Sequence, residues 1–402
     1  MLNQVKKPSE LKVLHVIPSV APSRGGPSKA VIEMVAALKY RGIDAEIATT
    51  NDDADTDLDV SLNRLVNYKS VPVRFFARVS TPINAIREFS FSPSFMSWMK
   101  ANIEYYDVIH VHAVFSFVST YTMWLARKRN IAFIVRPIGQ LEAWSLNQSK
   151  SKKEWYLKLI EQANLESANA IHFTADSERI QALERFPRLK AHTIPLGVNH
   201  NKSISALATP KEWNLKPKTA TICYLSRLHP KKGLELLLVA LSQLNNIDFQ
   251  LIIAGAGDSD YESFLKQQLI ALGLTKKCTF IGFIDGEAKQ HLLESSDIFA
   301  LTSYSENFGV AVLEAMAAGA MPFVSKEVAL SDIVQNNDLG TVCNLNVDDI
   351  RHKLGHDLNN IHHCRARAKK AQTYTQKHYQ WNAISIKLEQ LYLGCLSKNQ
   401  AD

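Results

Sequence analysis

The sequence has few of the features that mark a secreted, metal-binding or membrane-spanning protein. Its five cysteines are scattered over 402 residues, and none forms a Cys-x-x-Cys pair or a spacing with histidine that is typical of a metal site. No apolar run approaches the roughly 20 residues needed to span a bilayer. The first ten residues are polar and include Lys6 and Lys7, unlike a secretory leader. We therefore expect a chain of the reducing cytosol.

Motifs of nucleic-acid binding are also missing, although the formal net charge is +7. A positive balance suits nucleic acid, an anionic membrane surface or a phosphorylated substrate. Basic clusters stand at 127–129 and at 150–153, the second at the start of a predicted amphipathic helix over 150–163. We expect no nucleic-acid partner. The basic clusters could form a solvated surface or a peripheral contact with an anionic membrane, and both alternatives stay open. We expect the helix over 150–163 to be an ordinary surface helix.

Strand-like runs alternate with helical runs along the whole chain, which favours parallel β-sheets with crossover helices. The length favours two or three domains, and 46% hydrophobic with 21% charged residues is ordinary for a globular protein. Pro195 and Gly197 interrupt both patterns, so the segment 194–199 is a predicted hinge. The sequence therefore predicts an α/β protein with a domain boundary near residue 197.

The first predicted strand, 12–17, leads into a loop with Gly25 and Gly26 and then into a predicted helix over 28–40. Two glycines let the backbone approach a ligand closely, and the start of a helix can face a phosphate. The spacing is not that of a dinucleotide or Walker loop, so a plain tight turn is an equal alternative.

Two further stretches of the first half have unusual compositions. The acidic run 51–59 contains Asp-x-Asp three times, a pattern that could hold a divalent ion beside a diphosphate. No clear strand brackets it, so we expect a polar loop instead. The run 60–106 is the most aromatic part of the chain. Acceptor-site loops or a membrane-touching surface are alternatives there, and ordinary core beneath long connections is the prediction.

Polar residues follow two predicted strands of the first half, 107–113 and 131–135. Ligands of open α/β sheets bind beyond the carboxyl ends of the strands, where His112 and Arg136 stand. His112 is a candidate for hydrogen bonding to a sugar, and a histidine that only completes the core is the alternative. We expect His110 and His112 to face opposite sides of their sheet.

In the second half, Arg227 and Lys232 straddle one turn at the end of a predicted strand, 220–225. Fixed cations at such a position suit a diphosphate, because charge-assisted hydrogen bonds are strong and arginine binds two oxygens at once. The alternative is a pair of exposed turn cations without a ligand.

The segment 303–319 combines a loop, a predicted helix and a glycine that can cap it. Glu306 lies in the loop, and Glu314 follows in the helix. Between them, residues 307–309 stand at or just before the helix start, where free N–H groups and the helix dipole favour an anion such as a phosphate. The segment therefore offers two carboxylates around an anion site, and a capped core helix is the alternative.

These motifs together resemble the retaining glycosyltransferases of family 4 (glycosyl transferases group 1), which have the GT-B fold. The resemblance rests on Ser-Glu-Asn-Phe-Gly-x4-Glu-Ala-Met-Ala-Ala-Gly, Ser-Arg-Leu-x-x-x-Lys-Gly, Arg-Gly-Gly-Pro, Pro-x-Gly-Val-Asn, Leu-x-Ile-x-Gly-x-Gly and Phe-x-Gly-x-Ile. It implies two Rossmann-like, doubly wound domains that face a cleft. Residues 1–197 would bind the acceptor, residues 198–376 would bind the nucleotide sugar, and 377–402 would form a C-terminal helix that packs back on the first domain.

The resemblance also implies roles for single residues. The catalytic group would comprise Glu306 at the transferred sugar, Arg227 and Lys232 at the diphosphate, and His112. Glu314 would meet the nucleotide ribose. The other donor-binding candidates are Gly26, Gly255, Phe283, Asn307, Phe308, Gly309 and Val310.

The acceptor side departs from the family pattern. The segment 136–144 resembles a loop, Pro-Arg-Gly-Met-Leu-x-x-Trp, of enzymes that assemble capsules, lipopolysaccharide and exopolysaccharide, but it has Arg-Pro-Ile-Gly in place of Pro-Arg-Gly. Some relatives place a histidine after this strand against the donor sugar. None follows it here, so His112 does not simply inherit that role. Arg136 and Glu142 are the acceptor-site candidates.

The implied activity is transfer of a hexose from a nucleotide diphosphate sugar to a hydroxyl of a glycan or lipid-linked acceptor, with retention of anomeric configuration. Its setting would be bacterial surface polysaccharide biosynthesis in the cytoplasm, at the inner face of the membrane as a peripheral protein. No cofactor or metal is expected, and the nucleotide sugar is a co-substrate. Two alternatives stay open: a nucleotide-sugar epimerase or hydrolase of the same architecture, and a non-catalytic sugar-nucleotide binding protein. The sequence does not name the donor sugar, the base or the acceptor.

Overall fold

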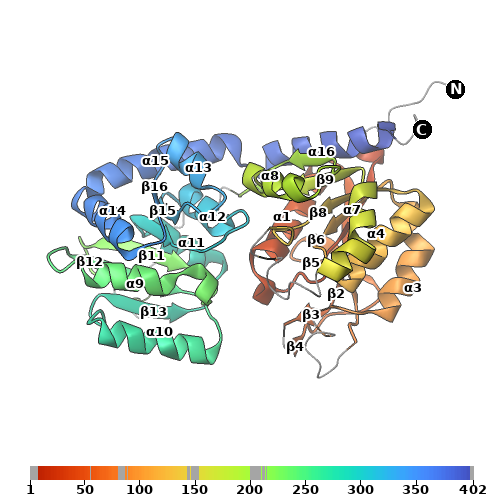
Figure 1. Cartoon of the computed structure of the whole chain (residues 1–402). Coiled ribbons are helices and arrows are strands. Elements are labelled where there is room, and N and C mark those ends of the chain that lie inside the picture. Colours follow the sequence, from red (N-terminus) through yellow and green to blue (C-terminus); the bar gives the residue numbers. More distant parts are fainter. Residues whose placement is uncertain are drawn as a thin grey trace. The chain divides into compact units, whose positions relative to one another are not determined.

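The computed structural model describes residues 8–54, 56–79, 87, 89–142, 145, 154–199, 210, 213 and 215–398. The chain divides into two compact units, Met1–Gly197 with Trp381–Asp402, and Val198–Gln380. Each unit is built around a main β-sheet with helices around it (Figure 1). The strands are mainly parallel in the first unit and entirely parallel in the second. The predicted α/β class with parallel sheets is therefore confirmed. Within the described ranges, no helix is long and apolar enough to cross a membrane.

The first unit is built on an eight-stranded sheet with the order β10-β9-β8-β7-β1-β2-β6-β5. Its strands are β1 (Lys12–Val16), β2 (Asp44–Thr50), β5 (Leu65–Tyr68), β6 (Val71–Phe76), β7 (Val108–His112), β8 (Ala132–Arg136), β9 (Ala170–Phe173) and β10 (Ala191–Thr193). All neighbours are parallel except β5 and β6. Strands β7 and β8 are buried along their whole length, as parallel strands covered on both faces are. The strand order reverses at β1, so ligands are expected beyond the carboxyl ends of β1 and β7.

Helices and short turns complete the first unit. The helices are α1 (Gly26–Tyr40), α3 (Pro93–Asn102), α4 (Phe117–Arg129), α7 (Gln162–Ser167), α8 (Asp176–Arg185) and α16 (Trp381–Lys398), with a π-helical turn at Leu157–Glu161 and 3-10 turns at Pro8–Glu10, Pro22–Arg24 and Ile103–Tyr105. Two short strands, β3 (Asp52–Asp53) and β4 (Thr56–Asp57), pair antiparallel outside the main sheet. The predicted helix over 150–163 is helical from residue 154, and its basic start at 150–153 lies outside the described residues.

The aromatic run belongs to the core of the first unit. Phe76, Phe95 and Met99 are at most 1% exposed and pack in one cluster with Val111 and Phe133. The Phe76 and Phe95 rings meet edge to face at 5.3 Å, which adds a favourable aromatic contact to the buried area. The prediction of ordinary core is thus confirmed for these residues.

Helix α16 is fixed to the first unit at several points along its length. The Trp381 indole N–H donates to Glu33 at 2.9 Å, and Arg41 pairs with Glu389 at 2.6 Å. A Cβ on Gly197 would lie 2.5 Å from the Trp381 ring, so the hinge glycine leaves room for that tryptophan. The chain therefore returns to its first unit at Trp381.

The second unit has a six-stranded, wholly parallel sheet with the order β13-β12-β11-β14-β15-β16. Its strands are β11 (Ala220–Leu225), β12 (Phe249–Ala254), β13 (Cys278–Gly282), β14 (Ile298–Leu301), β15 (Met321–Ser325) and β16 (Thr341–Cys343). Its helices are α9 (Leu234–Ser242), α10 (Ser259–Ala271), α11 (Gly286–Glu294), α12 (Val310–Ala318), α13 (Ser331–Asn336), α14 (Val347–Asn359) and α15 (Ile361–His378), with a 3-10 turn at Pro230–Lys232. The strand order reverses between β11 and β14, so the segments after these two strands form the expected ligand site.

Candidate active site

Two turns of the second unit interlock beyond the carboxyl end of β11. The Leu228 N–H donates to the Ala256 carbonyl at 2.9 Å. A Cβ on Gly255 would lie 1.9 Å from the Ser226 carbonyl oxygen, and Gly255 has a φ of +142°. Glycine is therefore required by the close approach of two backbones, and its predicted contact with a nucleotide stays a prediction.

The turn after β11 also meets the loop after β14. The 3-10 turn Pro230–Lys232 ends at Gly233, where a Cβ would lie 2.0 Å from the Thr302 carbonyl oxygen. The Thr302 hydroxyl donates to the Gly233 carbonyl at 2.7 Å. This close contact places the Lys232 ammonium against the Glu306 carboxylate. The Lys232 side chain is 15% exposed and the Glu306 side chain is 20% exposed. The structure thus joins two of the predicted catalytic residues.

Positive charge gathers on the same turn. Partial burial, and then the charges of three nearby cations, lower the pKa of the His229 ring. Those cations are Arg227, Lys231 and Lys232. The Arg227 side chain is exposed, and within the part of the chain that the structure describes it has no ion-pair partner. A diphosphate at this turn would meet an arginine that no carboxylate neutralises.

Gly309 sets the start of α12. Its φ of +85° is a left-handed conformation that glycine adopts readily, and the helix begins at the next residue. The N–H groups of the first helical turn can therefore face an anion, as predicted from the motif. Phe308 is buried, at 3% exposure, so its ring packs in the core, and its predicted contact with the donor stays a prediction. Asn307 and Val310 are half-buried on either side.

Glu314 lies on α12 and pairs with Lys289 of α11 at 2.8 Å. The two side chains are 10% and 17% exposed, so the pair is mostly shielded from water. Phe283 follows β13 and is 59% exposed, which leaves its ring available for stacking. Sequence reasoning singled out Glu314 and missed Lys289, because the two belong to different helices and no motif links them.

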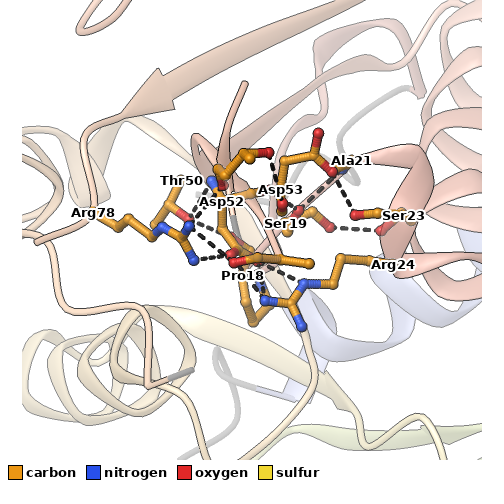
Figure 2. A network of polar contacts seen from close by, with 12 residues as sticks. Pro18, Ser19, Ala21, Ser23, Arg24, Thr50, Asp52, Asp53 and Arg78 are labelled. Atoms are coloured by element: carbon orange, nitrogen blue, oxygen red, sulfur yellow. Dashed lines mark hydrogen bonds and ion pairs between the residues drawn. The ribbon is translucent and has the colours of Figure 1, made fainter. Parts of the chain in front are cut away.

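The Gly25–Gly26 turn of the first unit is held by a partly buried ion-pair network (Figure 2). Asp52 is 1% exposed and accepts from Arg24 Nε at 2.7 Å and Nη2 at 2.9 Å. Its carboxylate also pairs with Arg78, which is 5% exposed and reaches Asp57 at 2.7 Å. The acidic run is therefore no plain polar loop: it forms the β3–β4 pair, and it fixes the residue that precedes the two glycines. Asp55 of this run lies outside the described residues.

His112 belongs to a buried histidine cluster. Our expectation that His110 and His112 face opposite sides was wrong, because residues two apart on a strand share a face. Their rings lie 4.3 Å apart, and His112 Nε2 is 3.0 Å from Nδ1 of His15 on the adjacent strand. All three rings are 0% exposed. A contact between His112 and a sugar stays a prediction, and the structure shows the residue as part of the core.

A fixed chain of hydrogen bonds links this cluster to α16. His172 Nε2 donates to the Ile194 carbonyl at 2.7 Å, so its Nδ1 is the acceptor for His110 Nε2 at 3.3 Å. His110 Nδ1 in turn accepts from the Tyr392 hydroxyl at 2.9 Å. Burial is the first cause that lowers the pKa of each of these rings, to about 3 for His172. The rings are therefore neutral at pH 7.

The geometry of the cluster also meets one condition for a metal site. Ring nitrogens of His15, His110 and His112 lie within 4.8 Å of one another. Hydrogen bonds already engage nitrogens of all three rings, however, and the buried charge of Arg136 acts on each of them. A cation among these nitrogens would be repelled by that charge. We therefore interpret the cluster as neutral imidazoles that tie the sheet to α16.

The acceptor-site candidates, Arg136 and Glu142, stand on either side of a turn supported by Glu178. Arg136 is 1% exposed at the end of β8, and burial lowers its pKa to about 10 despite the opposing effect of Glu178. Glu178 accepts from the Gly139 N–H at 2.9 Å and from the Thr174 N–H at 3.1 Å. Glu142 is half-buried and ends this turn. Arg136 presents no surface to an acceptor here, so its predicted contact stays a prediction; residues 143 and 144 lie outside the described residues.

Comparison with known proteins assigns both halves of the chain. Residues 25–197 match the Glycosyl transferase 4-like domain, and residues 207–377 match Glycosyl transferases group 1. Together with the site just described, these matches make the chain a member of the group 1 (family 4) glycosyltransferases with the GT-B fold. The recognition made from the sequence motifs is confirmed.

Individual relatives resemble different parts of the chain. An uncharacterized glycosyltransferase of Methanocaldococcus jannaschii is 35% identical over 116 residues, which cover 29% of each protein. A glycogen synthase of Bacillus cereus is 29% identical over 188 residues, 45% of this chain and 39% of the synthase. The chain thus spans less than half the length of these two relatives. The GDP-mannose:cellobiosyl-diphosphopolyprenol alpha-mannosyltransferase of Komagataeibacter xylinus is 26% identical over 85% of this chain and 83% of that enzyme.

Solved structures share the fold over nearly the full length. Sucrose-phosphate synthase from Thermosynechococcus elongatus has a TM-score of 0.79 at 21% identity, and the match covers 95% of this chain and 98% of that one. Anabaena HepE in complex with UDP and glucose has a TM-score of 0.71 at 18% identity, with 94% and 98% covered. The predicted GT-B class with two Rossmann-like domains is therefore confirmed.

Proposed function

We propose that this protein is a retaining glycosyltransferase that moves a hexose from a nucleotide diphosphate sugar to a hydroxyl of a glycan or lipid-linked acceptor. One observation carries the proposal: Lys232 contacts Glu306 at the switch point of the second unit, beside Arg227 and the start of α12. Fixed cations and the start of a helix suit a diphosphate, and a carboxylate suits sugar hydroxyls.

The chemistry follows from these positions. The bond between the anomeric carbon and the diphosphate oxygen breaks, and negative charge grows on the leaving diphosphate. Arg227, Lys232 and the α12 start would stabilise that charge without a metal. The acceptor oxygen forms the new bond on the same face of the sugar, and its proton passes to the departing phosphate. Glu306 would hold the sugar through its hydroxyls.

The relatives support the substrate class and leave its details open. The mannosyltransferase from Komagataeibacter is named for a nucleotide sugar and a polyprenol-linked acceptor, and HepE was solved with UDP and glucose. These bases differ, so we assign no base to this chain. A lipid-linked acceptor of bacterial surface polysaccharide synthesis, such as that of lipopolysaccharide, is the acceptor we propose.

A two-stage experiment tests this function. UDP, GDP and ADP are first screened by thermal shift, since a ligand that binds only the folded protein raises Tm. Nucleotide sugars that contain the best-binding nucleotide are then offered with and without lipid-linked acceptors. Transfer that falls at least about 100-fold in Arg227→Ala or Glu306→Ala supports the proposal. Release or isomerisation of the sugar in the absence of an acceptor would favour a hydrolase or an epimerase. Binding of the nucleotide sugar without any turnover would favour a non-catalytic binding protein.

We also propose a peripheral position at the inner face of the cell membrane. Trp155 and Leu159 are each 68% exposed on one helical segment, and Trp124 is 40% exposed on the neighbouring α4. A hydrogen bond of 2.8 Å between Thr120 and Tyr156 links the two segments. Exposed basic residues accompany these apolar side chains: Arg127, Lys128 and Lys158. Exposed aromatic and aliphatic groups beside positive charge suit an anionic membrane surface.

A further inference from the structure

Each glutamate of the Glu306 and Glu314 pair is held by a lysine from a different element. Lys232 of the turn after β11 contacts Glu306, and Lys289 of α11 pairs with Glu314 at 2.8 Å. Only the first lysine belongs to a motif visible in the sequence, so Lys289 is the residue whose role is unassigned.

We infer that Lys289 is a positioning residue for the nucleotide ribose and acts through Glu314. The inference rests on the proposed function, in which Glu314 accepts hydrogen bonds from ribose hydroxyls. An ionised carboxylate has about four acceptor positions, so it can accept from a lysine and from other donors at the same time. Bonds from hydroxyls to a carboxylate are stronger than bonds to a neutral acceptor.

Burial explains why a lysine is needed beside this carboxylate. Glu314 is only 10% exposed, and a carboxylate in such a place favours its neutral form unless a positive charge compensates. Protonation would convert one acceptor oxygen into a donor. Lys289 lies in the first turn of α11, where its backbone N–H donates to the Asp285 carbonyl at 3.2 Å, and its ammonium reaches the Glu314 carboxylate at 2.8 Å. The lysine therefore places a compensating charge beside the shielded carboxylate and fixes its orientation.

The test compares ribonucleotide and deoxyribonucleotide binding. The best binder among UDP, GDP and ADP and its 2′-deoxy form are titrated against wild type, Lys289→Gln and Lys289→Arg. Wild type is expected to prefer the ribonucleotide by about tenfold or more, as loss of a hydrogen bond to a charged group predicts. Lys289→Gln should reduce this ratio to about threefold or less, mainly by weakening ribonucleotide binding, and Lys289→Arg should retain it.

Lys353→Gln is the control, because Lys353 forms a more exposed lysine–carboxylate pair with Asp349 at 3.0 Å within α14 of the same unit. It should keep the wild-type ratio. A Lys289→Gln protein with native Tm and an unchanged ratio overturns the inference while the proposed function stands. If Lys289→Gln does not fold, Lys289→Met, which keeps the apolar stem, is measured in its place. Wild type that binds none of the three nucleotides overturns the proposed function and this inference together.

Discussion

Lys232 and Glu306 are in contact across 74 positions of sequence, and the contact joins the segments that follow β11 and β14. An ammonium group has three donors, so Lys232 can hold Glu306 and a phosphate oxygen at the same time. The pair therefore sets the separation between the group proposed for the sugar and the group proposed for the leaving diphosphate. Donor binding would add to this contact without dismantling it.

The first prediction concerns this pair. Lys232→Ala removes a fixed positive charge from the leaving group, and loss of one such donor typically costs about 2.7–4 kcal/mol of activation free energy. We expect kcat/KM for sugar transfer to fall about 10²–10³-fold. Lys353→Ala, which breaks a lysine pair elsewhere in the same unit, should leave kcat/KM within about twofold of wild type, consistent with a surface pair of under 1 kcal/mol. Equal losses in the two variants would contradict the assignment.

The sequence predicted the parts of the site that local motifs define. Arg227, Lys232, Glu306 and Gly309 all stand directly after strands or at a helix start, and the rule that ligands bind at carboxyl ends of parallel strands brings such residues together. The alternation of strands and helices, likewise a local pattern, predicted both sheets. The sheets could be predicted because short segments carry their whole signal, and the roles of the four site residues stay predictions.

Local sequence patterns could not predict the contacts between distant segments. Asp52 is 28 positions from Arg24 and 26 from Arg78, so its acidic run resembled a solvated loop until the two arginines were placed beside it. The pairing of Lys289 with Glu314 depends in the same way on how α11 packs on α12. The histidine error had another cause, since the two-residue repeat of a strand already puts His110 and His112 on one face.

The second prediction concerns Asp52. Asp52→Asn leaves Arg24 and the buried Arg78 without their shared carboxylate, and breaking a buried pair from one side costs about 3–5 kcal/mol. We expect the free energy of unfolding of the first unit to fall by this amount in urea denaturation. Transfer activity should fall as well, because Arg24 directly precedes the Gly25–Gly26 turn.

Asp59 provides the matched control for that experiment. It belongs to the same acidic run and is exposed, so Asp59→Asn should change stability by less than about 0.5 kcal/mol. A stability loss in Asp52→Asn no larger than that of Asp59→Asn would show that the network in Figure 2 does not hold the turn.

The third prediction is a pH dependence set by the histidine cluster. Burial lowers the pKa of His15 and of His172 from 6.5 to about 3, whereas the unfolded chain keeps the ordinary value. Between pH 6.5 and 3 the unfolded state thus binds more protons, so the free energy of unfolding falls as pH decreases. At pH 5.5 the loss should be on the order of 1 kcal/mol for each such histidine. Urea denaturation at pH 7.5, 6.5 and 5.5 measures it.

A variant separates this effect from general acid sensitivity. His15→Gln should be less stable than wild type at pH 7.5, because it disturbs the cluster, but should lose less stability on going to pH 5.5. The exposed His352 is the control, and His352→Gln should show the wild-type pH slope. An identical slope in His15→Gln and wild type would mean that folding does not lower the pKa of His15, and would contradict the prediction.

The fourth prediction tests the membrane face. Wild type should sediment with vesicles that contain anionic lipid and should be released by high salt, because screening weakens attraction between charges. Trp155→Ser with Leu159→Ser removes two exposed apolar side chains, each worth about 1.5–3 kcal/mol on burial, and should weaken binding at least tenfold. Phe264→Ser with Ile270→Ser is the control, since these side chains are 49% and 66% exposed on α10 of the other unit. If both double variants bind alike, the face around Trp155 does not contact the membrane.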